Sequence, residues 1–192
     1  LFGGSGSYGN GAAMRVHALG VFFSNDLEHV VDQATLRATT THTHPEGIAG
    51  AIAVAVATAL LAQRKGPRPP QEFLSQLLRL TPPSEVRRGI EASVSFAPED
   101  FDQAVAARGN GSRITAQDTV PLCGWWAAHM QGQYERAMWA LVQAKGEEDT
   151  TCAIVGGILS AGGTLPPASW SQATEDLPDL AMLPAPDAYL FG

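Results

Sequence analysis

One uncharged stretch limits the possible folds of this 192-residue chain more than any other feature. Residues 47–63 carry no charged side chain and consist mainly of alanine and other apolar residues, and the preceding Pro45 and Glu46 are typical of a helix start. A helix that is apolar on all sides must be buried, and this stretch is shorter than the roughly 20 residues needed to cross a bilayer. We therefore expect a buried helix over residues 46–63 and no membrane span.

The remaining sequence predicts further helices joined by short turns that contain Gly or Pro. Apolar residues recur at helical spacing, whereas a strand-like pattern is confined to residues 94–96, which are too few to form a strand. The predicted fold class is therefore all-α. Asn25 and Asp149 are the expected N-caps of two of these helices. The expected helices cover residues 26–39, 46–63, a segment around 73–78, 84–95, 97–107, 116–129, 134–145 and 150–161, and a structured loop enters a helix near residues 12–16.

Length and composition indicate one folded domain. Hydrophobic residues make up 45% of the sequence and charged residues 16%, which argues against disorder. Because prolines become frequent after Gly162, we predict a helical domain over residues 1–170, with Trp170 docked on it, and a Pro-rich tail over residues 171–192. The chain starts at Leu1 rather than Met, so we expect it to be part of a longer protein.

The charge balance and the cysteines exclude or favour several classes of protein. Twelve Lys and Arg residues stand against nineteen Asp and Glu residues, which gives a net charge of -7. Since the basic residues form no extended cluster, we exclude nucleic acid as a main partner. Cys123 and Cys152 lie in apolar surroundings without a C-x-x-C pattern, which is typical of free thiols in a reducing cytoplasm.

The run GSYGNG at residues 6–11 is the first candidate for a ligand site. Its glycines let backbone N–H groups turn inward, Ser7 and Asn10 add side-chain donors, and a helix follows, which together suit a phosphate group. Tyr8 could stack on a base. On spacing alone a flexible Gly-Ser turn is the simpler interpretation, because short glycine motifs carry little weight by themselves.

A pair of histidines, His42 and His44, stands just before the uncharged stretch. Two histidines at this spacing could chelate a transition metal, but no further Cys or His is near in the sequence. A hydrogen bond to a ligand, or a role in starting the helix, is therefore favoured.

Two later clusters carry polar groups suited to binding. Glu147, Asp149 and Thr150 offer the hard oxygen ligands that Mg²⁺ prefers, although acidic residues at this position also cap a helix and complement its dipole. Residues 109–121 contain a Gly-Asn-Gly turn followed by a helix with an internal proline. This segment is either a ligand-facing loop or simply a turn and a kinked helix.

In this order the four clusters resemble the ADP-ribosylglycohydrolase family, whose members remove ADP-ribose from modified side chains or cleave related ADP-ribosyl compounds. The resemblance is carried by GSYGNGAAMRV at residues 6–16, by Thr41-His42 with GIAGA at 47–51, by DTVP at 118–121 and by residues 146–157. It covers nearly the whole chain up to Trp170.

The resemblance implies an all-α orthogonal bundle, here partial, with a cleft that holds ADP-ribose beside two Mg²⁺ ions. It places the diphosphate and the adenosine at the loop, with two aromatic residues flanking the adenine, and a histidine in contact with the ligand. Metal binding is assigned to an Asp-x-Asp-Thr motif, with which Glu147, Asp149 and Thr150 align. The implied ligand-binding residues are Phe2, Ser7, Tyr8, Gly9, Asn10 and His42.

Two departures from the family pattern shape the functional hypothesis. Glu147 stands where the family has Asp, and its extra methylene shifts the ligand oxygens relative to a Mg²⁺ site with bonds of about 2.1 Å. No Thr-Asp-Asp motif occurs in the sequence, and we expect this motif and the family's catalytic Glu upstream of Leu1, so the catalytic residue is unknown.

The leading hypothesis is the C-terminal part of a Mg²⁺-dependent enzyme that hydrolyses the N- or O-glycosidic bond between ADP-ribose and a protein side chain or a small compound. The alternative is a noncatalytic module that binds ADP-ribose or another protein. A helical domain without a ligand is the third possibility.

Overall fold

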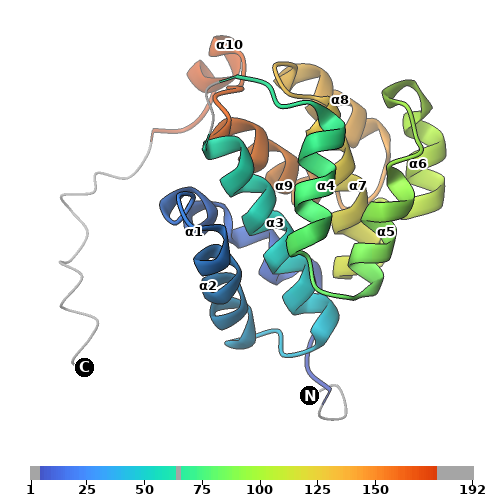
Figure 1. The fold of residues 1–192 in the computed structure, drawn as a ribbon. Coiled ribbons are helices and arrows are strands. Elements are labelled where there is room, and N and C mark those ends of the chain that lie inside the picture. The colour runs from blue at the N-terminus through green and yellow to red at the C-terminus, as the bar shows by residue number, and fades with distance from the viewer. Residues whose placement is uncertain (1–4, 64–65, 177–192) are drawn as a thin grey trace.

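The computed structural model describes residues 5–63 and 66–176. Within these ranges the chain forms helices and one isolated β-bridge, between Gly9 and Thr115, and no strand. The predicted all-α class is therefore confirmed (Figure 1). In chain order the elements are η2 (Asn10–Arg15), α1 (His17–Phe22), α2 (Leu27–Thr39), α3 (Pro45–Ala62), α4 (Pro70–Leu80), α5 (Glu85–Ser93), η3 (Pro98–Asp100), α6 (Phe101–Arg108), α7 (Ala116–His129), α8 (Tyr134–Gln143), α9 (Glu148–Ala161) and α10 (Ala168–Gln172).

Helix α3 is the buried helix expected from the uncharged stretch. His44 caps its N-terminus, where the ring nitrogen Nδ1 accepts a hydrogen bond from the N–H of Glu46 at 3.1 Å. The elements η2, α1, α2, α4, α7 and α9 pack around it (Figure 1). By length and composition α3 is the one helix among residues 5–63 and 66–176 that could cross a membrane, but 78% of it is buried inside the protein. Its apolar surface is thus covered by neighbouring helices.

Helix α7 is also largely buried, and Pro121 lies inside it. Gly89 in α5 makes room for Pro121, because a Cβ on this glycine would lie 2.5 Å from the proline ring. Trp125 and Trp126 are fully buried, and each indole N–H donates to a backbone carbonyl, that of Phe96 at 3.3 Å and that of Ala137 at 3.2 Å. The polar atoms of both rings are therefore satisfied in the core.

Several predicted helix boundaries differ from the observed ones because a neighbouring residue makes the cap. The cap of α2 is Asp26 and not Asn25, since the Asp26 carboxylate accepts from the N–H of His29 at 3.0 Å. Asp149 is not the cap of α9 but lies in its first turn, and Glu147 holds the N-cap position without a side-chain capping bond. The segment predicted as one helix at residues 97–107 consists of η3 and α6.

The end of the described chain forms one more short helix, α10. Its Trp170 packs against Tyr134 and Trp139 of α8, as expected for a docked residue. Cys123 is buried and Cys152 half-buried, and both are free thiols.

Candidate functional site

The Gly-rich run at residues 6–11 is an ordered loop pressed against the segment before α3. Gly6 has a φ angle of 79°, and a Cβ at this position would lie 1.9 Å from Oγ1 of Thr43. Only glycine fits both the conformation and the space. The hydroxyl of Ser7 accepts a hydrogen bond from the N–H of Gly9 at 3.2 Å, which leaves the hydroxyl proton available to a ligand.

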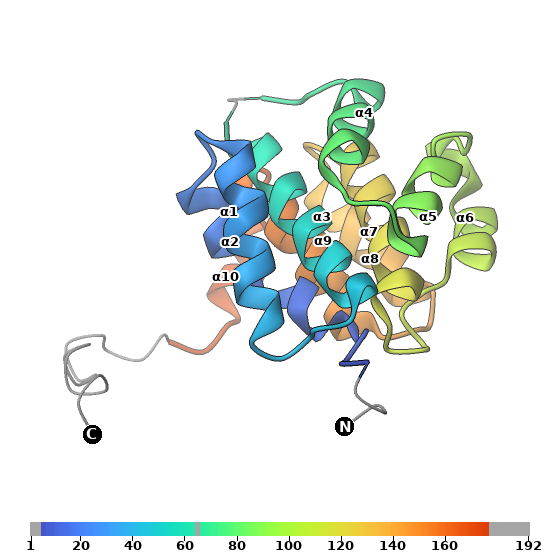
Figure 2. The same cartoon turned by 60° about the horizontal axis from the view of Figure 1, so that its bottom comes forward.

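A loop from a distant part of the chain closes the other side of this run. The N–H of Ala116 donates to the carbonyl of Tyr8 at 2.9 Å, and the N–H of Asn10 donates to the carbonyl of Ile114 at 3.3 Å. The two segments therefore lie side by side although they are far apart in the sequence. Figure 2 shows the N-terminal segment beside the first turn of α3 and the loop that leads into α7.

These segments enclose a pocket of about 420 Å³, a volume typical of small-molecule sites. Tyr8 is 42% exposed, and its ring meets that of His44 edge to face with centroids 5.3 Å apart. The tyrosine is thus held in place and still presents aromatic surface to a base. The residues that line the pocket are Ser7, Tyr8, Gly9, Asn10, Gly11, His42, Arg113, Ile114 and Thr115.

His42 turns its ring nitrogen Nε2 toward the glycines of the loop. This atom lies 3.4 Å from the position that a Cβ on Gly9 or Gly11 would occupy. The other ring nitrogen, Nδ1, lies 2.7 Å from Oγ1 of Thr41, which also accepts from the guanidinium of Arg15. The Thr41 hydroxyl therefore links the guanidinium of Arg15 to the ring of His42. Burial, and then the charge of Arg15, lower the pKa of His42, so the ring is neutral at pH 7.

Asn10 connects the loop to the acidic turn before α9. Its side chain is buried, and Nδ2 donates both to Oγ1 of Thr119 at 3.0 Å and to the carboxylate of Glu147. The Thr119 hydroxyl in turn donates to the carbonyl of Thr115 at 2.8 Å. The structure thus brings Asn10 and Glu147 together although 137 residues separate them.

The acidic turn itself is positioned by Asn110, which belongs to the loop before α7. The side-chain amide of Asn110 donates to the carbonyls of Ala144 at 2.9 Å and Lys145 at 3.1 Å. The backbone carbonyl of Asn110 accepts from the N–H of Glu147 at 3.1 Å. A Cβ on Gly146 would lie 2.0 Å from that carbonyl, so glycine is required here. The Gly-Asn-Gly turn therefore orients the acidic turn relative to the pocket.

The expected metal ligands are close to the loop but do not form a complete metal site. Glu147 is half-buried and Asp149 is exposed, and the latter accepts from the N–H of Thr150 at 2.8 Å. The Thr150 hydroxyl is buried beside Met14, 4.0 Å from its sulfur. Within the described part of the chain, no three His, Cys, Asp or Glu side chains gather closely enough to hold a metal ion. The donors suit Mg²⁺ in kind but not in number.

The pocket is also lined by Arg113, Ile114 and Thr115, which belong to the segment 109–121 that was predicted to be either a ligand-facing loop or a turn, but which were not named individually. Ile114 has a φ angle of 56°, which is unfavourable for a β-branched residue, and its side chain is 60% exposed at the pocket. The N–H of Arg113 donates to the carboxylate of the buried Asp118 at 2.9 Å, which holds the loop in this conformation. The only local signal was their place between the Gly-Asn-Gly turn and the DTVP motif. Phe2, expected to flank the adenine, lies outside the described residues.

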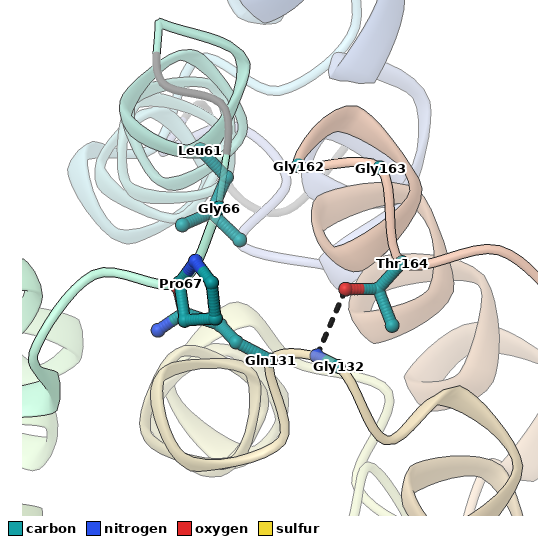
Figure 3. Close-up of a pocket in the computed structure, with 8 residues that line it drawn as sticks. All are labelled: Leu61, Gly66, Pro67, Gln131, Gly132, Gly162, Gly163 and Thr164. Carbon is teal, nitrogen blue, oxygen red and sulfur yellow. Dashed lines mark hydrogen bonds between the residues drawn. The ribbon is translucent and has the colours of Figure 1, made fainter.

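A second hollow differs from the pocket because no titratable side chain lines it. It has a volume of about 280 Å³ and lies where the C-terminal ends of α3, α7 and α9 meet (Figure 3). Glycines make up half of its lining, no titratable side chain contributes, and the N–H of Gly132 donates to Oγ1 of Thr164 at 2.9 Å across one side. Its lining therefore offers a ligand few polar side chains.

Known proteins are similar in sequence to most of this chain. The sequence model of the family described as ADP-ribosylglycohydrolase matches residues 1–188. An uncharacterized protein of Archaeoglobus fulgidus is 30% identical over 168 residues, which cover 86% of this chain and 53% of that protein. ADP-ribosylhydrolase ARH3 of Homo sapiens is 28% identical over 207 residues, which cover 91% of this chain and 56% of that protein. The mouse ARH3 protein is also 28% identical, over 95% of this chain and 57% of its own length.

The chain spans little more than half the length of these relatives. The family match, in contrast, covers nearly the whole of this sequence and includes the loop, the histidine and the acidic turn described above. This chain belongs to the ADP-ribosylglycohydrolase family.

Proposed function

We propose that this chain supplies the ADP-ribose-binding loop and part of the Mg²⁺ site of a longer hydrolase. That enzyme releases ADP-ribose by cleaving its N- or O-glycosidic bond to a modified protein side chain or a small compound. Family membership and the relatives described as ADP-ribosylhydrolases support this reaction class. The observation that carries the proposal is the contact between Asn10 and Glu147, because it joins a nucleotide-binding loop to carboxylates.

The pocket offers complementary groups to each part of the nucleotide. Tyr8 and Ile114 present apolar surface on which an adenine can stack. The diphosphate is negatively charged, and the exposed guanidinium of Arg113 and the Ser7 hydroxyl can donate to it. His42 can donate as well, in the tautomer that carries its proton on Nε2. Binding energy from these parts then fixes the position of the reacting ribose.

The acidic turn lies where it can hold a metal ion at the ribose, at the other end of the ligand. Glu147, Asp149 and Thr150 would hold the ion, together with ligands from water, substrate or another segment. When bound, Mg²⁺ supplies orientation of the ribose hydroxyls and activation of water at the anomeric carbon. Asn10 contributes by holding the Glu147 carboxylate at the loop. The carboxylates also favour the positive charge that develops on the sugar in the transition state.

Calorimetric titration of this chain with ADP-ribose tests the binding part of the proposal. We expect Arg113→Ala to weaken binding by about tenfold. A hydrogen bond to a charged group contributes about 1.5–3 kcal/mol, and solvent reduces this contribution at an exposed side chain such as Arg113. Arg136→Ala in α8 is the matched control, since Arg136 is exposed, outside the pocket, and should leave the affinity unchanged. Equal affinities of the two variants would reject the proposed diphosphate contact.

Hydrolysis is tested on the longer open reading frame with an ADP-ribosylated peptide. We expect release of ADP-ribose that depends on Mg²⁺ and is stimulated by Glu147→Asp, since the shorter side chain restores the family's ligand position. The alternative is a noncatalytic ADP-ribose-binding module, favoured by the Glu at this position. ADP-ribose binding without any Mg²⁺ dependence, no release of ADP-ribose, and no effect of Glu147→Asp would establish that alternative.

A further inference from the structure

His44 caps helix α3 although histidine is not a usual cap residue. Its ring nitrogen Nδ1 accepts from the N–H of Glu46 at 3.1 Å, a position in which an oxygen of Ser, Thr, Asp or Asn is the common acceptor. Those side chains are smaller and are the preferred caps. A histidine here therefore offers something that the cap alone does not require, namely an aromatic ring beside the pocket.

The backbone of Tyr8 is fixed from two sides. A Cβ on Gly47, in the first turn of α3, would lie 2.8 Å from the carbonyl oxygen of Ser7 and 3.5 Å from Cα of Tyr8, so the loop packs directly on this turn. On the other side, the carbonyl of Tyr8 accepts from the N–H of Ala116 at 2.9 Å. The position of the Tyr8 backbone is thus set by the first turns of α3 and α7.

The ring of Tyr8 needs a separate contact, because a fixed backbone still allows rotation about the side-chain bonds. Tyr8 is 42% exposed, and within residues 5–63 and 66–176 His44 is the one residue whose ring it meets. The two ring centroids are 5.3 Å apart and the ring planes are at 69°, which is a favourable geometry for an aromatic pair. His44 therefore favours one orientation of the Tyr8 ring.

The turn that carries His44 is tied to a neighbouring helix by Glu46. The two carboxylate oxygens of Glu46 accept from the N–H groups of Glu85 at 2.7 Å and Val86 at 3.0 Å, the first two residues of α5. A carboxylate at a helix N-terminus is stabilised by the helix dipole and makes strong hydrogen bonds to the free N–H groups. The start of α3 is thereby held against α5, and with it the ring that contacts Tyr8.

We propose that His44 is a positioning residue for adenine binding, which holds the ring of Tyr8 in the orientation that stacks on the base. The two parts of its side chain act separately, since Nδ1 caps α3 and the ring contacts Tyr8. His44 does not line the pocket, so its effect on a ligand passes through Tyr8. This inference rests on the proposed function, because it takes ADP-ribose as the ligand.

Two substitutions separate the cap from the ring. His44→Asn keeps a good cap but removes the ring, so it should retain the melting temperature and weaken ADP-ribose binding about twofold to tenfold, the effect of losing one aromatic contact or one fixed rotamer. His44→Phe keeps a ring but cannot accept from Glu46, so it should lower the melting temperature by about 1–8 °C and retain most of the affinity. A purely structural role predicts the opposite order of affinities, because the less stable variant would then bind more weakly.

The matched control is His29→Asn in α2. His29 also forms an edge-to-face pair, with Phe23 at 4.6 Å and 82°, and neither residue lines the pocket. This variant loses the same kind of ring contact and should leave the affinity for ADP-ribose unchanged.

Calorimetric titration with ADP-ribose measures the affinities, and fluorine NMR of protein labelled with 3-fluorotyrosine reports on the ring without a ligand. The sequence contains three tyrosines, and Tyr8→Phe identifies the signal of Tyr8. In ligand-free His44→Asn this signal should move toward the chemical shift of free 3-fluorotyrosine, because the ring loses its neighbour. In His44→Phe it should stay apart from that value.

The outcomes distinguish this inference from the proposed function. Equal affinities of His44→Asn and the wild type, or an unchanged Tyr8 signal in His44→Asn, would overturn the positioning role and leave the proposed function intact. Weaker binding by His44→Phe than by His44→Asn would also overturn it, since the cap and not the ring would then govern affinity. A folded wild type that does not bind ADP-ribose would reject the proposed function and the positioning role together.

Discussion

Replacing Asn10 by Asp tests the contact on which the proposed site depends. The substitution keeps the shape of the side chain but exchanges the amide that donates to Glu147 for a carboxylate. Two carboxylates about 4 Å apart repel each other by roughly 4 kcal/mol at an effective dielectric constant of about 20. The pair can escape this repulsion by sharing a proton, which costs about 1.4 kcal/mol for each pH unit above an ordinary carboxyl pKa near 4.

The expected loss in the free energy of unfolding is therefore about 2–4 kcal/mol at pH 7. For a chain of this size it corresponds to a fall in melting temperature of roughly 4–16 °C. The folded variant binds one more proton than the unfolded chain, so the loss should shrink as the pH falls toward 4. Urea denaturation followed by circular dichroism at pH 7 and pH 5 measures both effects.

Two further variants complete this experiment. Adding Glu147→Gln to Asn10→Asp should restore most of the stability, because the new amide can donate to the new carboxylate. Asn25→Asp introduces the same charge at an exposed position and should change stability by no more than about 0.5 kcal/mol. Wild-type stability of Asn10→Asp at pH 7, or no recovery in the double variant, would show that the two side chains do not interact.

Three other predictions concern the loops and the half-buried His17. Ile114→Gly should raise the free energy of unfolding by up to about 1 kcal/mol, because it relieves a left-handed conformation, and yet weaken ADP-ribose binding; a less stable variant would contradict the strain. Gly6→Ala should reduce ADP-ribose affinity more than tenfold. Gly132→Ala is the control, because Gly132 has a similar φ angle of 81° but a Cβ there would have no atom within 4 Å, and it should leave the affinity unchanged. Equal affinities of the two variants in calorimetry would rule out a steric role for Gly6. Burial lowers the pKa of His17 below 6.5, so its contribution to stability is present above pH 6.5 and is lost as the pH falls through the folded pKa. Urea denaturation of His17→Gln should therefore show a weaker pH dependence than the wild type, and an equal slope would contradict this assignment.

The helices were largely predictable because their signals are local. The observed bounds of α7 agree with the predicted segment at residues 116–129, and α3 begins and ends one residue before its predicted limits. Burial of an uncharged stretch and a proline at a helix start are both visible without any tertiary contact. The caps were less predictable, since Asn25 and Asp26 are both suitable residues and the backbone angles decide between them.

The candidate site was predictable only in pieces. The glycine run, His42 and the acidic turn each carry a recognisable pattern, and the family resemblance gave them a common ligand. The sequence indicated only that residues 109–121 could form a ligand-facing loop, and the place of Ile114 in the pocket depends on backbone pairing with residues 8–10.

The sequence by itself determined the helical class, the buried helix and the chemical types available for binding, because these follow from composition and from spacing within one turn or loop. Only the tertiary structure decided that Asn10 contacts Glu147 and that Asn110 orients the acidic turn. Such contacts join residues far apart in the chain, and their geometry is set by how α3, α7 and α9 pack. Local patterns contain no information on that packing, because many arrangements of the same helices bury the same apolar faces.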